Sequence, residues 1–167
     1  MNTSIWTDIF KYKKHINIIE ILRDIPVFEG LSKLDLLKIS KLLHLRQYKK
    51  DEFIFREKEP GESMYIIKSG SIEITKCIKK ETVTLSSLEK GSFFGEISLV
   101  DSDSRSATAK AKEDTQLLGF FRADLMHLID RNPRLASFIL YQLSRVLGKR
   151  LRVLDASISN HHVPTHQ

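Results

Sequence analysis

The sequence predicts an α+β fold, in which one β unit of eight strands lies between N-terminal helices and C-terminal helices. Short β-prone runs separated by turn signals fill residues 43–121, and apolar residues recur at helical spacing before and after them. The length of 167 residues is that of one ordinary domain with one core. We therefore expect a single domain over residues 1–160, followed by a flexible tail over residues 161–167.

Helices are expected over residues 4–42. Isoleucines recur at helical spacing in residues 5–19, and Pro26 ends this first segment. Ser32 is a suitable N-cap for a second, short helix. Asp35 follows at the third helical position, where a carboxylate interacts favourably with the free N–H groups of the first turn.

The β unit is expected over residues 43–121. Its strands are predicted at residues 43–48, 52–56, 63–68, 71–76, 82–86, 91–94, 107–111 and 116–121. Turn residues such as Glu59-Pro60-Gly61 and Ser69-Gly70 separate them. Many short strands at spacings of about ten residues favour a barrel or sandwich over a βαβ fold.

The C-terminal helices are expected over residues 122–159. Asn132-Pro133 opens the long helix, since proline is tolerated in the first helical turn. Apolar residues three or four apart then follow, in the spacing of a coiled-coil seam. They are Leu140, Leu143, Leu147, Leu151, Leu154 and Ile158. Such a seam could join two copies of the chain in a homodimer.

The composition excludes several classes of protein. Cys77 is the only cysteine, so the chain can form no intramolecular disulfide and no iron–sulfur cluster or zinc finger built on cysteines. Charged residues interrupt every apolar run, which leaves no signal peptide and no membrane span, and we expect a cytoplasmic protein. The net charge of +6 either favours an anionic partner or keeps the surface soluble.

The segment from Phe94 to Ala107 carries the features of a phosphate site. Gly95 lets the backbone bend sharply, and a helical turn after it would direct free N–H groups at an anion. Arg105 can hold a phosphate through two parallel hydrogen bonds, and Ser106 adds a hydroxyl group. The segment therefore predicts an anion clamp.

Glu96 distinguishes this clamp from a general anion site. A carboxylate beside a phosphate repels it, unless the carboxylate accepts a hydrogen bond from another group of the same ligand. A sugar hydroxyl supplies that hydrogen bond, so the segment indicates a ribose joined to a phosphate. Two plainer readings stay open: Arg105 could pair with Asp101 or Asp103, and Glu96 could be an exposed carboxylate at a helix N-terminus.

These residues also resemble a known family. Phe-Gly-Glu-Ile-Ser-Leu at residues 94–99, followed by Arg-Ser-Ala-Thr at residues 105–108, is similar to the phosphate-binding cassette of cyclic nucleotide-binding domains. Such domains occur in catabolite activator proteins, regulatory subunits of cAMP-dependent kinases and cyclic nucleotide-gated channels. The resemblance extends over about residues 25–152, including Glu59–Ile67 with Gly70 and the Asn132-Pro133 helix start. It implies an eight-stranded antiparallel β-roll (jelly-roll barrel).

The resemblance also implies roles for the cassette. Glu96 would accept a hydrogen bond from the ribose 2′-hydroxyl, and Arg105 would pair with the cyclic phosphate. Backbone amides would come from Gly95, Ile97, Ser98 and Ala107, and Ser106 would contact the phosphate or the base.

Further ligand contacts are expected from outside the cassette. Leu85 and Ser86, on the strand just upstream, are candidates for the base wall. Arg150, Leu151 and Leu154 are candidates for a lid from the C-terminal helix, and the two leucines are equally good candidates for the dimer seam.

The predicted function is a non-enzymatic receptor whose C-terminal helix moves when the nucleotide binds and so signals to an unknown effector protein. cAMP is favoured as the ligand; the alternatives are cGMP or an interaction module that has lost the ligand. The chain shows no motif of a hydrolase, P-loop or zinc protease, and we expect no metal. A haem-sensing relative would use His44 or His127. The 35 residues after Asn132 leave no room for a recognition helix, so we expect no sequence-specific DNA binding.

Overall fold

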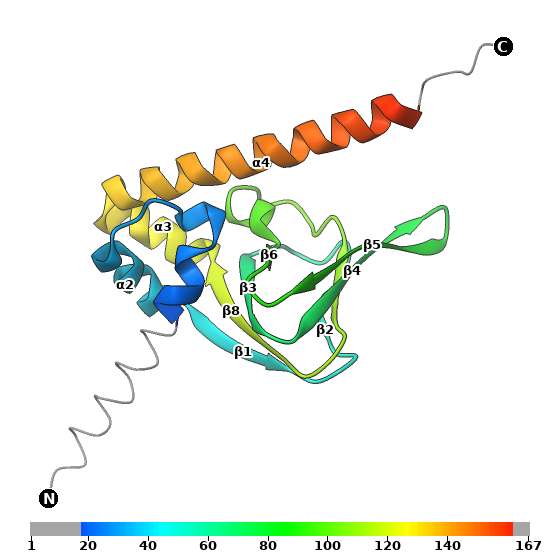
Figure 1. The fold of residues 1–167 in the computed structure, drawn as a ribbon, viewed down its shortest axis with the longest axis horizontal. Helices are drawn as coiled ribbons and strands as arrows, with labels where there is room; N and C mark the ends of the chain where they lie inside the picture. Colours follow the sequence, from blue (N-terminus) through cyan, green and yellow to red (C-terminus); the bar gives the residue numbers. More distant parts are fainter. Residues whose placement is uncertain (1–17, 162–167) are drawn as a thin grey trace, which may run out of the picture.

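The structure is a computed structural model that describes residues 18–161, with side chains described to residue 156 (Figure 1). Residues 18–23 are helical, and the rest of the predicted first helix lies outside the described residues. The helical elements are η1 (Pro26–Phe28), α2 (Lys33–Leu42), η2 (Glu96–Leu99), α3 (Arg122–Arg131) and α4 (Pro133–His161). The strands are β1 (His44–Tyr48), β2 (Phe53–Phe55), β3 (Ser63–Ser69), β4 (Ser71–Ile78), β5 (Glu81–Glu89), β6 (Phe93–Phe94), β7 (Thr108–Ala111) and β8 (Thr115–Phe121).

The predicted order of helices, eight antiparallel strands and helices is confirmed, and the N-cap of α2 is also as expected. The Asp35 amide donates to Ser32 Oγ over 3.2 Å, and the Ser32 hydroxyl donates to the Asp35 carboxylate over 2.7 Å. At the other end of the chain, α4 continues to His161, slightly past the predicted end at residue 159. The remainder of the predicted tail lies outside the described residues.

Among the described residues, the strands form two antiparallel sheets of four, ordered β1-β8-β3-β6 and β2-β7-β4-β5. The β-roll is therefore open, rather than a closed barrel, since no ladder joins the two sheets within this part of the chain. The β4–β5 hairpin extends away from the body of the molecule in Figure 1.

Two apolar clusters hold the domain together, and β3 belongs to both. Met64 and Ile66 face a large cluster shared with the helices. Tyr65 and Ile67 face a smaller cluster between the sheets. This division follows from the two-residue period of a strand, which points successive side chains to opposite faces.

The packing of the long helix α4 differs from the predicted coiled-coil seam. Its first half packs against η1 and α3, and Leu140, Leu143 and Leu147 belong to the large apolar cluster of the domain itself. Leu151 and Leu154 are 59% and 58% exposed, and the side chain of Ile158 lies outside the described part. Periodic leucines indicate a buried face, but they do not say whether the same chain or another one covers it.

In the view of Figure 1, the second half of α4 runs above the β-roll. No helix among the described residues is both long enough and apolar enough to cross a bilayer.

Candidate functional site

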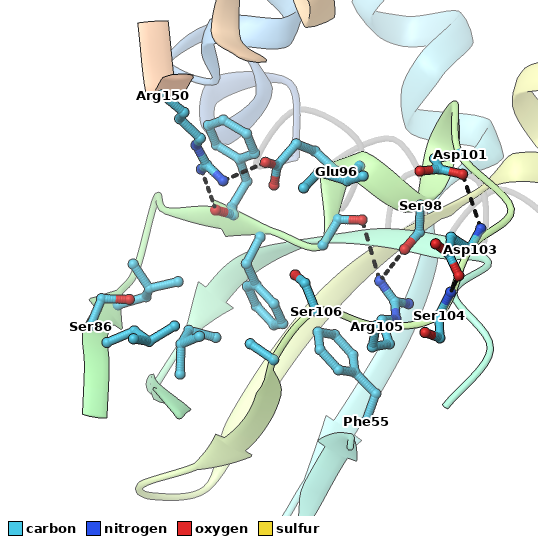
Figure 2. A pocket seen from close by; sticks show the side chains of 18 of the residues that line it. Phe55, Ser86, Glu96, Ser98, Asp101, Asp103, Ser104, Arg105, Ser106 and Arg150 are labelled. Carbon is cyan, nitrogen blue, oxygen red and sulfur yellow. Dashed lines mark hydrogen bonds and ion pairs between the residues drawn. The ribbon is translucent and has the colours of Figure 1, made fainter. Parts of the chain in front are cut away.

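A cavity of about 380 Å³ lies between the β-roll, the loop from β6 to β7, and α4 (Figure 2). Both halves of the predicted cassette line it, together with a wall of apolar side chains from the second sheet and residues from α4. The lining residues are Phe55, Ile74, Leu85, Ser86, Leu88, Phe93, Phe94, Gly95, Glu96, Ile97, Ser98, Asp101, Asp103, Ser104, Arg105, Ser106, Ala107, Arg150 and Leu154.

The turn that begins the cassette has the predicted geometry. Gly95 has φ +74°, a left-handed conformation that residues with a side chain seldom adopt, and it is the N-cap of η2. A Cβ atom at this position would lie 2.7 Å from Nη1 of Arg105. Glycine at residue 95 therefore serves both the backbone turn and the close approach of the arginine.

Arg105 is buried, with 6% of its surface exposed, and its guanidinium is held by oxygen atoms of neutral groups. Nη1 donates to the carbonyl of Ser63 over 2.8 Å and to the hydroxyl of Ser98 over 2.9 Å. Nη2 donates to the Ser63 hydroxyl over 3.1 Å, and the guanidinium carbon lies 4.0 Å from the centre of the Phe55 ring. Burial lowers the pKa of Arg105 from its ordinary value, because a desolvated cation is disfavoured.

The charge of Arg105 has no ionic partner among the described residues, and its buried Nε has no hydrogen-bond partner there. The alternative that Arg105 pairs with Asp101 or Asp103 is therefore wrong. Those carboxylates instead accept hydrogen bonds from the backbone of their own loop, at the amides of Asp103 and Ser104. A buried cation without a counter-ion, lining a cavity, is the arrangement that an anionic ligand completes.

Glu96 is also buried, with 1% of its surface exposed, so the alternative of an exposed carboxylate is wrong. Arg150 of α4 donates from Nη1 to Oε1 of Glu96 (Figure 2). The Arg150 guanidinium also lies over the ring of Phe93, 5.0 Å from its centre. Among the described residues, the second oxygen of Glu96, Oε2, has no hydrogen-bond partner.

The structure gathers nearly all of the other predicted site residues at the same cavity. Ile97, Ser98, Ser106 and Ala107 line its cassette side, and Leu85 and Ser86 line the opposite wall. Of the predicted lid residues, Arg150 and Leu154 reach the cavity, whereas Leu151 does not line it. Leu151 lies one residue after Arg150 on the helix, which turns its side chain away from the side that faces the cassette.

Comparison with known proteins agrees with this geometry. Residues 45–132 match the family model described as the cyclic nucleotide-binding domain. The chain belongs to the cyclic nucleotide-binding domain family.

Individual relatives and structures support the assignment. The chain is 34% identical to the cyclic AMP receptor protein of Thermus thermophilus over 80% of its own length and 60% of that protein. It is 35% identical to the cAMP-dependent protein kinase regulatory subunit of Mycosarcoma maydis over 59% of its length, but only 19% of that protein. The crystal structure of a cyclic nucleotide-binding domain from Methylobacillus flagellatus shares the fold, with a TM-score of 0.78, 24% identity, and coverage of 93% of this chain and 88% of that one. The chain thus spans less than two thirds of these two curated relatives.

Several residues of this cyclic nucleotide-binding domain were not identified from the sequence. Arg122, at the start of α3, donates from Nε to the carbonyl of Ser98 and from Nη2 to that of Asp101, each over 2.9 Å. Nη2 also donates to the carbonyl of Gly61. Arg122 therefore joins the cassette to the loop before β3 and to the helices.

Ser63 and Phe55 were missed for a related reason. They hold Arg105 from positions 42 and 50 residues earlier in the chain, on β3 and β2. Gly61, two residues before Ser63, gave the one local signal, since it belongs to the predicted turn Glu59-Pro60-Gly61.

Metal and haem alternatives find no support at this site. Among the described residues, no group of three or more His, Cys, Asp or Glu side chains is placed to hold a metal ion. His44 and His127 do not line the cavity. Nε2 of His44 instead lies 3.3 Å from Oδ2 of Asp124.

Proposed function

We propose that this domain is a cAMP receptor, and that the cavity binds the nucleotide with its cyclic phosphate at Arg105. The observation that carries the proposal is the buried guanidinium with no ionic partner among the described residues and with an unpartnered Nε. A cyclic phosphate would supply both the negative charge and the acceptor oxygens. Charge-assisted hydrogen bonds of this kind are the strong ones in a desolvated site.

The ribose is assigned to Glu96. Oε2 of this carboxylate has no partner among the described residues, so it can accept a hydrogen bond from the 2′-hydroxyl. Oε1 meanwhile remains available to Arg150. Backbone amides of Gly95, Ile97, Ser98 and Ala107 and the hydroxyl of Ser106 would complete the contacts to the phosphate.

The base would lie on the wall away from Arg105. Ile74, Leu85, Leu88 and Leu154 make this part of the cavity apolar, with Ser86 beside them. Such a wall suits adenine, because it places no carboxylate where guanine presents its N–H donors. The names of the two curated relatives, a cyclic AMP receptor protein and a cAMP-dependent kinase regulatory subunit, favour the same nucleotide.

Binding would act through α4. Arg150 and Leu154 reach the cavity from this helix, so a nucleotide that contacts both favours the closed position of α4. A ligand that prefers one arrangement shifts the population towards it, and an effector protein would recognise the shifted helix. The domain would act as a receptor and leave the nucleotide unchanged.

Isothermal titration calorimetry with cAMP, cGMP and a cyclic dinucleotide tests the proposal. We expect saturable heat with cAMP and weaker binding of cGMP. Tighter binding of cGMP would overturn the choice of nucleotide, and no heat with any of the three would overturn the receptor. Chromatography of the nucleotide after prolonged incubation tests the absence of catalysis, since recovery of 5′-AMP would contradict it.

A further inference from the structure

A second cavity, of about 230 Å³, lies against α4 and shares Phe93 and Arg150 with the nucleotide cavity. Its remaining lining comes from η1, the residue that follows it, and the middle of α4. The full set is Pro26, Glu29, Phe93, Gln142, Arg145, Val146, Lys149 and Arg150. Nothing in the proposed nucleotide site uses Arg145, Gln142 or Lys149.

The lining of this second cavity is strongly basic. Arg145, Lys149 and Arg150 contribute three cations, and Glu29 contributes the one carboxylate of the set. Among the ion pairs of the described residues, only that of Arg150 with Glu96 involves any of the three cations. Like charges held together in a concave site create a positive potential that attracts anions.

One of the cations is held in position by a buried amide. Gln142 is 5% exposed; its Nε2 donates to the carbonyl of Glu29 over 2.6 Å. Its Oε1 accepts a hydrogen bond from Nη1 of Arg145 over 2.8 Å. Arg145 is thus oriented before any ligand arrives, which lowers the entropy cost of binding.

We propose that this second cavity binds a phosphate group, either as inorganic phosphate or at the end of a small phosphate monoester. The guanidinium forks of Arg145 and Arg150 match phosphate oxygens, and the Lys149 ammonium adds a point charge. Pro26, Val146 and Phe93 provide apolar surface for the body of an ester. The carboxylate of Glu29 opposes binding but leaves the site with a net positive charge.

Occupancy of this site regulates the nucleotide cavity through the shared arginine, a consequence that rests on the proposed function. A phosphate in the second cavity competes with Glu96 for the guanidinium of Arg150. Loss of the Arg150–Glu96 pair releases α4 from the cassette and disfavours the closed arrangement. Because coupling between two sites is reciprocal, phosphate and cyclic nucleotide each weaken the binding of the other.

Direct binding is tested by NMR titration of the full chain with potassium phosphate, against potassium chloride at matched ionic strength. We expect saturable shifts of backbone amides in residues 142–150. Lys149→Gln should weaken phosphate binding about tenfold, as expected for loss of a hydrogen bond to a charged group. Glu29→Gln should tighten it, and Arg105→Ala should leave it unchanged. The site is disproved if the shifts do not saturate or if Lys149→Gln binds like the wild type.

A parallel titration with glycerol phosphate distinguishes the two sources of the group. Tighter binding of the ester identifies a phosphate monoester as the ligand, and tighter binding of the inorganic ion identifies phosphate itself. If the shifts caused by inorganic phosphate and by glycerol phosphate are both the same as those caused by potassium chloride, the proposal is overturned.

Coupling is tested by measuring cAMP affinity in phosphate and in chloride. We expect a phosphate concentration that saturates the wild type to weaken cAMP binding about fivefold, at the lower end of typical coupling, and to weaken it by a smaller factor in Lys149→Gln. An equal loss in Lys149→Gln would mean that phosphate competes directly at Arg105, which contradicts the coupling. If the wild type binds no cyclic nucleotide, the receptor proposal fails while the NMR titration still decides the phosphate site.

Discussion

Arg150 of α4 donates a hydrogen bond to the buried carboxylate of Glu96, 54 residues earlier in the chain. The contact joins the start of the cassette to the exposed half of the last helix (Figure 2). Glu96 is almost completely buried, whereas the Arg150 side chain is 49% exposed. The pair therefore links the β-roll to the half of α4 that lies beyond the apolar core of the domain.

Replacing Arg150 by Gln should loosen the end of α4. The buried Glu96 would lose its cation, which is costly, although the exposure of Arg150 moderates the effect. We expect the amides of residues 150–156 to exchange about tenfold faster in hydrogen-exchange measurements, since about 1.4 kcal/mol of local stability corresponds to that factor.

The matched control for this change is Arg152→Gln. Arg152 is exposed on the same helix, and its replacement by Gln removes the same charge. Equal acceleration of exchange in the two variants would show that the Arg150–Glu96 pair does not hold α4.

Replacing Arg105 by Ala should abolish most of the cAMP affinity while the fold survives. The loss should exceed about a hundredfold, because removing one partner of a desolvated charge pair costs roughly 2–5 kcal/mol. Stability should change little, since the variant also removes a buried cation that has no ionic partner among the described residues. Calorimetry and thermal unfolding measure the two quantities.

Arg105→Lys separates the charge from the geometry. Lysine keeps the charge but not the guanidinium fork, so its cAMP affinity should lie between those of the wild type and Arg105→Ala. Unchanged affinity in Arg105→Ala would place the phosphate elsewhere.

The sequence predicted those parts of the site that are close together in the chain. Gly95, Glu96 and Arg105 lie within one loop, and their spacing carries the chemistry of a ribose-phosphate site. The partners that hold them are remote: Ser63 and Arg122 lie on β3 and at the start of α3. Their positions depend on how the sheets and helices pack, which no local pattern specifies.

The fold, too, could be predicted only where it depends on local sequence patterns. The eight strands followed from alternation and turn residues, but their division into two open sheets depends on pairings between distant segments. The periodic leucines of α4 were interpreted as a coiled-coil seam, whereas Leu143 lies in the core of its own domain. Periodicity identifies which face is apolar, whereas the rest of the chain determines what covers it.

Self-association through the distal half of α4 remains a prediction that can be measured. Leu151 and Val153 are 59% and 71% exposed, and Leu151 does not line the nucleotide cavity. We expect a wild-type mass above the monomer value of 19.3 kDa in sedimentation equilibrium, and a return to the monomer in Leu151→Glu.

Leu34→Glu is the control for the Leu151 variant. Leu34 is 71% exposed on α2, so it tests the effect of an added charge on an exposed leucine away from α4. A monomeric wild type at high protein concentration, or dissociation by Leu34→Glu as well, would contradict an α4 interface.

Gly61 should be intolerant of a side chain because of its contact with the cassette. A Cβ atom there would lie 2.2 Å from Oγ of Ser98 and 2.9 Å from its Cβ. Ser98 Oγ accepts a hydrogen bond from Arg105, so its displacement also disturbs the phosphate-binding guanidinium. Gly61→Ala should therefore cost about 1–3 kcal/mol in urea unfolding, as overpacking does, and weaken cAMP binding as well.

A second substitution tests the cause of this loss. Ser98→Gly removes the two atoms nearest to a Cβ at residue 61 and leaves the carbonyl oxygen of Asp103 at 3.2 Å, so the double variant should be more stable than the sum of the single changes predicts, by about 1 kcal/mol. Gly91→Ala is the control for the glycine change. It has open space around its Cβ position, but its φ of +84° should cost about 1–2 kcal/mol in backbone strain without a loss of cAMP affinity. Additive effects of Gly61→Ala and Ser98→Gly would show that the contact between the two residues does not position the cassette.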